Sequence, residues 1–284
     1  MHWDAILQPF PKLPVIFTAD NRAALKYSAK ACQLDNISSY ISYCGVPPLP
    51  ADLLGRFNLD PVLIIALLLL AGTHLFALNK LGDKSLRGYS LSGWGIAALA
   101  LLSPLCALSV SLFAARVGQH MILILIAAPL IAMALPQHDT SFRRLVINST
   151  AFTIALWFWH MPGPYMATFR SDFIYWAMHL SLFGSAILLW RDLLHHSLDR
   201  ALTVMAASGF ASVQMGLLGA VLTFAGTPLF PIHFDTAPIW GLSPLADQQL
   251  GGLLMWVPGL LFFLIAVWRS LVILLPEQAM LTKD

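Results

Sequence analysis

Seven long apolar stretches are the feature that most limits what this chain can fold into. Each is as long, or nearly as long, as the ~20 residues that a helix needs to cross a bilayer. Lipid offers no hydrogen-bond partner to a backbone amide, so each stretch must form an α-helix. The sequence predicts an all-α membrane protein, a bundle of seven transmembrane helices within residues 43–275. The stretches are 61–78, 92–113, 118–135, 146–163, 172–190, 201–225 and 248–275.

Composition supports this class of protein, and the basic residues predict its orientation. Hydrophobic residues make up 58% of the chain and charged residues 11%. Basic residues gather in alternate connections, which indicates that these connections are cytoplasmic. They are Lys80, Lys84, Arg87, Arg143, Arg144, Arg191, Arg200, Arg269 and Lys283. The other side keeps only Arg116 and Arg170 between helices. The N-terminus is therefore expected outside, and the C-terminal tail 276–284 inside.

Residues 1–42 fit this pattern poorly. They carry Lys12, Arg22, Lys26 and Lys30 on the expected outer side, without the apolar core of a cleavable signal peptide. One interpretation is an N-terminal extension that forms an outer tail. The other, slightly favoured, is a mis-assigned start, with the working protein beginning near Tyr43.

Several classes of chemistry find no support in the sequence. Cys32, Cys44 and Cys106 show no CxxC spacing, so neither a redox pair nor a disulfide framework is expected. No Walker loop, GxSxG elbow or HExxH motif occurs. The basic residues are too few and too dispersed to bind nucleic acid. Transport or catalysis driven by ATP is therefore not expected.

Histidines and methionines are the remaining chemical resource. His120, His160 and His179 fall at a similar depth in the outer halves of three predicted helices, and Met255 matches them in a fourth. Met121 and Met161 lie beside two of the histidines. Imidazole and thioether ligands together suit Cu(I), so these residues are the candidate metal ligands. The alternative is that the histidines form ordinary hydrogen bonds and the methionines fill apolar space.

A carboxylate and two amides open the last apolar stretch. Asp247 shares one helix face with Gly251 and Met255, at spacings of four residues. We expect Asp247 to act as a helix cap rather than as a metal ligand. Gln248 and Gln249 would support the site by fixing this carboxylate or by bonding across helices. The glycines at 251 and 252 predict a close-packing notch.

Separate blocks of sequence, in order, resemble the CtaG family of cytochrome c oxidase assembly factors, the multi-span proteins associated with caa3-type oxidases. The resemblance runs from about Tyr43 to Ile273. One departure is Phe230, where the family often has Tyr. The blocks are Cys44-Gly-Val-Pro-Pro-Leu-Pro50, His120-Met-Ile-Leu, Ala128-Pro-Leu130, Leu156-Trp-Phe-Trp-His-Met-Pro162 with Tyr165, His179, Leu218-Gly-Ala-Val-Leu-Thr-Phe224, Pro228-Leu-Phe-Pro231 and Asp247-Gln-Gln-Leu-Gly-Gly-Leu-Leu-Met-Trp256.

The resemblance implies an assembly factor for a haem-copper terminal oxidase in the bacterial cytoplasmic (inner) membrane. It further implies delivery of Cu(I) from the outer half of the membrane. The expected partners are cytochrome c oxidase subunits, other copper chaperones and the lipid bilayer. Two alternatives belong to other classes of protein. One is a membrane electron carrier in which paired histidines bind haem b. The other is a cofactor-free scaffold that holds oxidase subunits.

Overall fold

A computed structural model describes residues 42–82, 84–136 and 140–281. The predicted N-terminal extension, apart from Ser42, lies outside the described residues. Residues 41–284 group into one compact unit. This part of the chain is helical, and its described residues form no β-strand. The expected all-α class is confirmed.

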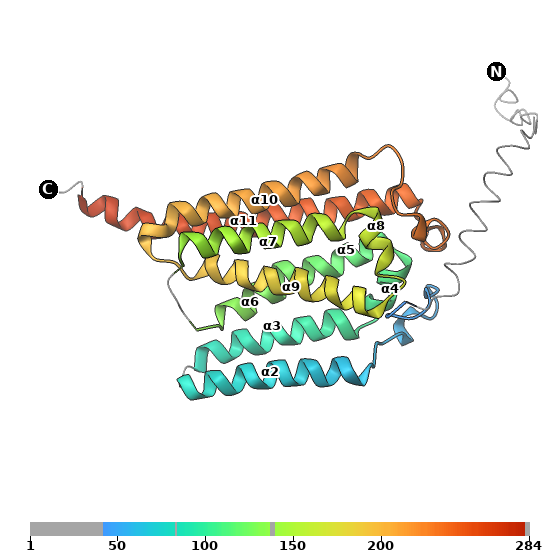
Figure 1. Cartoon of the computed structure of the whole chain (residues 1–284), viewed down its shortest axis with the longest axis horizontal. Helices are drawn as coiled ribbons and strands as arrows, with labels where there is room; N and C mark the ends of the chain where they lie inside the picture. Colours follow the sequence, from blue (N-terminus) through green and yellow to red (C-terminus); the bar gives the residue numbers. More distant parts are fainter. Residues whose placement is uncertain (1–41, 83, 137–139, 282–284) are drawn as a thin grey trace, which may run out of the picture. The chain divides into compact units, whose positions relative to one another are not determined.

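The helices run back and forth between two ends of the unit (Figure 1). Short 3-10 turns and loops join them, and helix α11 continues past the predicted end of the last span. The bounds are α2 (Pro61–Leu81), α3 (Lys84–Leu102), α4 (Leu105–Ser111), α5 (Phe113–Met121), the π-helix η2 (Ile122–Ala127), α6 (Ala128–Met133), α7 (Phe142–Trp159), α8 (Pro162–Ala167), α9 (Asp172–Leu194), α10 (Ala201–Phe224) and α11 (Pro244–Leu281). The 3-10 turns are η1 (Leu53–Gly55), η3 (Leu198–Arg200), η4 (Pro231–His233) and η5 (Ala237–Trp240).

Within the described residues, five helical segments are long and apolar enough to cross a membrane. Helices α3 and α4 make a sixth if the pair, bent by 47° around Pro104, counts as one broken span. The predicted stretch 146–163 forms α7, which is not among these segments. Helix α7 is less apolar than these segments because it contains Arg143, Arg144 and Asn148. The five segments are Pro61–Lys80, Phe113–Met133, Asp172–Leu194, Leu198–Phe224 and Pro244–Leu275.

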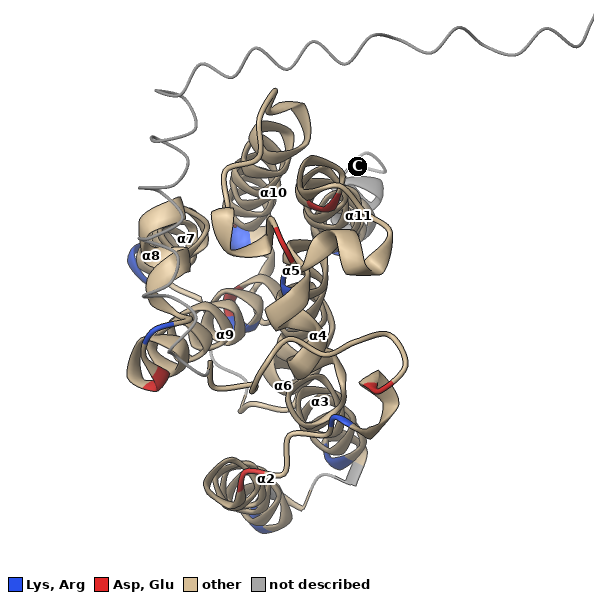
Figure 2. Cartoon of the chain, turned by 90° about the vertical axis from the view of Figure 1, so that its right-hand side faces the viewer, with Lys and Arg blue, Asp and Glu red and all other residues tan. Residues whose placement is uncertain are grey.

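Helix packing places α5, η2 and α9 in the interior of the unit. Helix α2 packs on α3 at one edge, and α10 packs along α11 at the other. Between these edges, α11 contacts α5, α3 contacts η2 and α6, and α9 contacts α6 and α7. Figure 2, in which the cartoon is coloured by residue type, shows that charged positions are sparse on these helices. The interior helices are therefore the ones on which buried polar groups can meet.

Asp247 joins α11 to the start of α5. Its two carboxylate oxygens accept hydrogen bonds from the backbone N–H groups of Phe113 (2.7 Å) and Ala114 (3.0 Å). These amides belong to the buried first turn of α5, and the first turn of a helix has no intrahelical acceptor for them. The expected cap is therefore present, but Asp247 caps a different helix from its own.

Two glycines let α11 approach its neighbours this closely. A Cβ at Gly251 would lie 2.5 Å from the ring of Phe113, and one at Gly252 would lie 2.6 Å from the carbonyl oxygen of Gly219 in α10. Any side chain at either position would push a helix away. The predicted packing notch is confirmed. It brings α11 close to α5 at Gly251 and close to α10 at Gly252.

The prediction that the cysteines form no disulfide is wrong. Cys44, in the segment before α2, is bonded to Cys106 in α4, with 5.5 Å between their Cα atoms. The two residues are 62 positions apart in sequence. They meet because the α2–α3 hairpin returns the chain to the end at which it began. Spacing along the chain carries no signal of such a contact.

We expect Asp247→Ala to lower the free energy of unfolding by roughly 2 kcal/mol, because it leaves two buried N–H groups without an acceptor. Asp247→Asn keeps one acceptor oxygen and should lose less. Denaturant titration in detergent measures both changes. Equal losses for the two variants would contradict the capping role.

Candidate metal-binding site

Three histidine rings meet in the interior of the bundle. His120 lies in α5, His160 ends α7, and His179 lies in α9. The ring centroid of His120 is 5.2 Å from that of His179 and 5.9 Å from that of His160. All three side chains are buried. His120 and His179 each lie about two turns from the start of their helices, which explains their common depth.

Backbone carbonyls fix which nitrogen of two of these rings faces the cluster. The Nδ1 of His160 bonds to the carbonyl oxygen of Leu156 (2.7 Å), and the Nδ1 of His179 bonds to that of Tyr175 (3.1 Å). A carbonyl oxygen can only accept, so Nδ1 carries the proton. In the neutral ring, Nε2 therefore keeps a lone pair. Metal-binding histidines are commonly oriented by this kind of bond.

Three ring nitrogens of the cluster have no hydrogen-bond partner among the described residues. They are both nitrogens of His120 and the Nε2 of His179, and all three are shielded from solvent. Leaving a buried polar atom without a partner costs about 1–3 kcal/mol. Such atoms call for an explanation, and a bound metal ion is one.

The methionines are less closely tied to the rings. Met255 is fully buried in α11, which packs against α5, and belongs to the same apolar core as Met121. Met161 is half exposed at the start of α8. In the part of the chain that the structure describes, no group of three or more His, Cys, Asp and Glu side chains is arranged to hold a metal ion. The structure thus gathers the three histidines without a closed coordination shell.

The polar residues at the start of α11 are used in packing. Asp247 is occupied by the first turn of α5. Gln248 donates to the carbonyl oxygen of Leu222 (3.1 Å) and accepts from the N–H of Leu229 (2.6 Å), so it fastens the end of α10 and the loop beyond it. The backbone oxygen of Gln249 accepts from Thr223 (3.5 Å). These residues position helices around the cluster and do not face it as ligands.

A π-helix begins two residues after His120, at Ile122. Residues Ile122–Ala127 make the wider turn, and Pro129, which has no N–H, follows shortly afterwards. The carbonyl oxygen of Ile124 accepts a bond from the indole N–H of Trp190 (2.8 Å). π-helical turns occur often at functional sites, so this irregularity adds to the case for His120.

Arg116 is a buried residue that sequence reasoning assigned to an outer connection. It lies one turn before His120 in α5 and is 1% exposed. One guanidinium nitrogen donates to the hydroxyl of Thr168 (2.6 Å), and the group lies 4.0 Å from the ring centre of Phe169. Its position four residues before His120 was the available signal. Intramembrane charges of this kind are functional candidates by default.

His233 is a second residue that the sequence did not single out. The loop between α10 and α11 carries it into the core, where it is 2% exposed. Its Nδ1 bonds to the carbonyl oxygen of Ser111 (3.1 Å), and its Nε2 accepts from the hydroxyl of Tyr165 (2.7 Å). Thr236 also donates to Ser111 (2.6 Å). These bonds hold the loop over the end of the bundle nearest the histidine cluster.

The attachment of this loop should weaken in acid. Burial, with the nearby Arg116 charge, lowers the pKa of His233 to about 3, against ~6.5 in an unfolded chain. Between these values the unfolded chain binds a proton that the folded chain excludes, so stability falls as pH drops below about 6.5. His233→Gln, which does not titrate, should show a shallower fall. Melting temperatures at pH 7.5 and 5 test this, and parallel curves would contradict it.

Comparison with known proteins gives one family. The family model for cytochrome c oxidase caa3 assembly factors matches residues 88–274. The match includes the three histidines of the cluster, Arg116, His233 and most of α11. No curated protein and no solved structure shows significant similarity to the chain.

Proposed function

Because the chain belongs to the family of cytochrome c oxidase caa3 assembly factors, we propose that it binds Cu(I) at the histidine cluster and delivers it to the oxidase. The ligands are His120, His160 and His179, with Met255 as a soft ligand from α11. Family membership supports the role in assembly. The observation that supports copper binding is the set of buried ring nitrogens without a hydrogen-bond partner.

The surroundings of the cluster favour a soft monovalent ion. Neutral imidazole and thioether groups bind Cu(I) without a compensating carboxylate. The guanidinium of Arg116 lies one turn from His120, and it repels a divalent ion twice as strongly as a monovalent one. A monovalent ion also loses less hydration energy on entering a dry site. Cu(I) tolerates low coordination numbers, which suits a cluster without a closed ligand shell.

Delivery would proceed by ligand exchange. The Nε2 of His179 and both ring nitrogens of His120 have no hydrogen-bond partner among the described residues, so they are free to bind the ion. Incoming histidines of the oxidase would replace these ligands one at a time, and the ion would remain coordinated throughout. Assembly of this kind makes and breaks no bond in an organic substrate, so the role is not enzymatic.

The proposed direction of delivery is from the outer half of the bacterial inner membrane. The Cys44–Cys106 disulfide lies at the same end of the bundle as the cluster, since the hydroxyl of Tyr175 is 3.3 Å from one sulfur and the carbonyl of Tyr175 binds His179. Disulfides persist in oxidising compartments, which supports an outward position for this end. The basic connections lie at the other end.

Cu(I) titration against a competing chelator tests the proposal directly. Under reducing conditions, the wild-type protein in detergent should hold about one Cu(I). A His120/His160/His179 triple alanine variant should lose it. The same variant should fail to support oxidase assembly in cells, measured as oxidase activity in membranes.

His74 provides a matched control for this experiment. It is a histidine of the same bundle, but its ring bonds to Ala134 (3.2 Å), Ser90 (3.0 Å) and Trp94 (3.1 Å). His74→Ala should keep the copper of the wild type. Size-exclusion profiles must show that each variant is folded. Equal copper in the triple variant and the wild type would remove the copper site from the proposal.

The outcomes also separate the two other classes. A haem b protein would show an absorption spectrum that depends on the same histidines. The space between His120 and His179 is too small to hold a water molecule. It therefore offers no room for a porphyrin. A cofactor-free scaffold would keep its assembly activity when the folded triple variant is used.

We further propose seven spans with the N-terminus outside, where α7 crosses beside α9, and α3–α4 and α5–α6 each cross once. Asp235, in the loop after α10, and Asp199, in the loop before it, are both exposed. In a Cys32→Ser background, Asp235→Cys should react with a membrane-impermeant maleimide in intact cells. Asp199→Cys should react only after permeabilisation. The reverse pattern would invert the orientation.

A further inference from the structure

The two halves of the Cys44–Cys106 disulfide differ in exposure. Cys44, in the segment before α2, is partly exposed, whereas Cys106 in α4 is 1% exposed. An attacking thiolate therefore meets the sulfur of Cys44, and the sulfur of Cys106 becomes the leaving group. Cysteines that take part in exchange occupy partly exposed positions of this kind, and inert structural cysteines are buried.

Two hydrogen-bond donors lie beside the leaving sulfur. The side-chain nitrogen of Asn58 is 3.6 Å from the sulfur of Cys106, and the hydroxyl of Tyr175 is 3.8 Å from it. The same hydroxyl is 3.3 Å from the sulfur of Cys44. Tyr175 is buried, and these two sulfurs are the only hydrogen-bond partners of its hydroxyl among the described residues. Since a neutral sulfur is a weak acceptor and a thiolate a strong one, the donors suit the reduced pair.

The segment that carries Cys44 is held in place without the disulfide. The N–H of Gly45 donates to the carbonyl oxygen of Ser42 (2.7 Å), and the hydroxyl of Ser42 donates to the carbonyl oxygen of Gly45 (2.7 Å). Cys44 lies inside this closed turn. Next to it, Tyr43 stacks on Tyr175 with 4.8 Å between their ring centroids. Reduction therefore leaves two thiols side by side.

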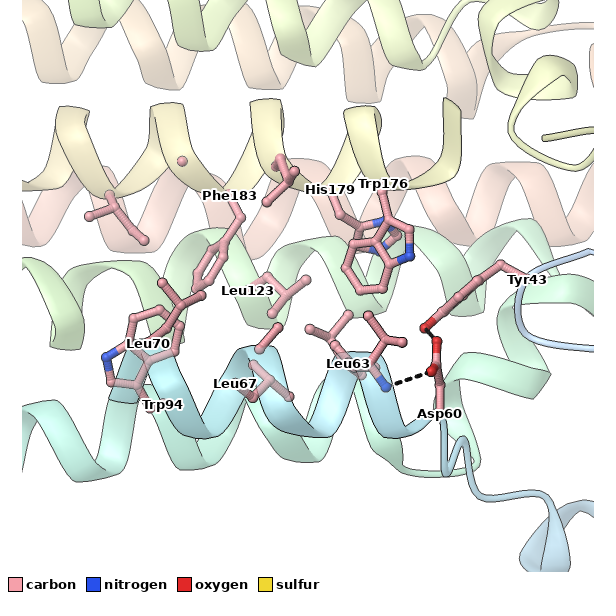
Figure 3. Close-up of a pocket in the computed structure, with 16 residues that line it drawn as sticks. Tyr43, Asp60, Leu63, Leu67, Leu70, Trp94, Leu123, Trp176, His179 and Phe183 are labelled. Carbon is pink, nitrogen blue, oxygen red and sulfur yellow. Dashed lines mark hydrogen bonds between the residues drawn. The ribbon is translucent and has the colours of Figure 1, made fainter. Parts of the chain in front are cut away.

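Tyr175 also connects this pair to the histidine cluster. Its ring centroid is 4.3 Å from that of His179, so one side chain separates the sulfurs from the cluster. The neighbouring cavity is not a second path for an ion. It has a volume of about 430 Å³ and lies between α2 and α9, with Tyr43 and Asp60 at one end (Figure 3). Its walls are almost entirely apolar, and they offer no series of ligands.

We propose that Cys44 and Cys106, once reduced, bind one Cu(I) through their thiolates and pass it to the histidine cluster when their disulfide forms again. Thiolates are soft ligands that select Cu(I). The two Cα atoms are 5.5 Å apart, which lets both sulfurs reach one ion. Structural zinc takes four ligands, and no third His, Cys, Asp or Glu of the described residues completes a group with these two. The transfer step rests on the proposed function, whereas binding at the sulfurs does not.

Loading begins with a protein dithiol of the outer compartment as reductant. Its thiolate attacks the sulfur of Cys44, a mixed disulfide forms, and the thiolate of Cys106 leaves. The second thiol of the donor then breaks the mixed disulfide. The donor ends as a disulfide, and the two cysteines have gained two electrons and two protons. Cu(I) displaces both protons, and the complex carries one negative charge, which the donors of Asn58 and Tyr175 stabilise.

Release requires a disulfide-bearing protein of the same compartment as oxidant. It takes two electrons from the two bound thiolates, takes up two protons and becomes a dithiol. The Cys44–Cys106 bond forms again, so Cu(I) loses both sulfur ligands at once. The nearest free ligands are the ring nitrogens of the cluster. Oxidation therefore gives the transfer its direction.

Reduction by dithiothreitol tests whether the bond can exchange in the folded protein. In a Cys32→Ser background, the full-length protein in maltoside micelles should gain two thiols without denaturant, counted by mass after maleimide labelling. Tyr175→Phe should slow this reduction roughly tenfold, because the leaving sulfur loses a donor. Tyr165→Phe should react like its parent, since the hydroxyl of Tyr165 bonds to His233 and not to sulfur. A bond that is reduced only after unfolding would overturn the proposal.

Copper counts on the same protein test the sulfur site. Ascorbate keeps copper as Cu(I) and leaves the disulfide intact. Reduction with a phosphine, followed by its removal, should raise the Cu(I) count by about one over the oxidised protein. The added ion should protect both thiols from maleimide. Cys44→Ser should show no such rise. A count that does not change on reduction would overturn the proposal.

The His120/His160/His179 triple alanine variant separates this inference from the proposed function. In its reduced form it should still hold one Cu(I) that protects the thiols. Diamide, which oxidises the thiols and produces no competing thiol, should then release this ion from the variant but leave it on the wild type. Release from both proteins would overturn the transfer step. No copper on the oxidised wild type, with the reduced site intact, would remove the proposed function and leave the sulfur site standing.

Discussion

The contact between Asp247 and the first turn of α5 sets the geometry of the interior. Helix α5 begins after an extended residue, Leu112, inside the bundle, where water cannot satisfy its first amides. A carboxylate supplied by α11 does so, and Gly251 and Gly252 let α11 lie close enough to deliver it. This contact fixes the position of α5. Arg116 and His120 then occupy successive turns at the depth of His160 and His179.

Some buried polar groups of the bundle are well supplied with partners. At the end opposite the cluster, the buried carboxylate of Asp192 is bonded by Asn148 (2.6 Å), Thr140 (3.3 Å) and Arg144 (3.3 Å). The ring of His74 is likewise satisfied at both nitrogens. In the histidine cluster, both ring nitrogens of His120 and the Nε2 of His179 have no hydrogen-bond partner among the described residues. Unsatisfied buried groups destabilise a fold, and these ring nitrogens are the observation on which the proposed copper site rests.

His179 borders two distinct spaces. Its ring faces His120 on one side, and it forms part of the cavity wall beside α2 on the other. Its Nε2 is shielded from solvent, so this nitrogen is not accessible from the cavity.

The sequence by itself determined the helical membrane class, the common depth of the three histidines and the notch at Gly251 and Gly252, because these depend on local composition and helical periodicity. The sequence blocks that resemble the oxidase assembly factors could also be recognised without the structure. Tertiary structure alone decided the Cys44–Cys106 bond, the capping of α5 by Asp247 and the burial of His233. Each joins residues distant along the chain. Periodicity in a bundle this apolar does not fix helix order or rotation, so only the packed structure could bring them together.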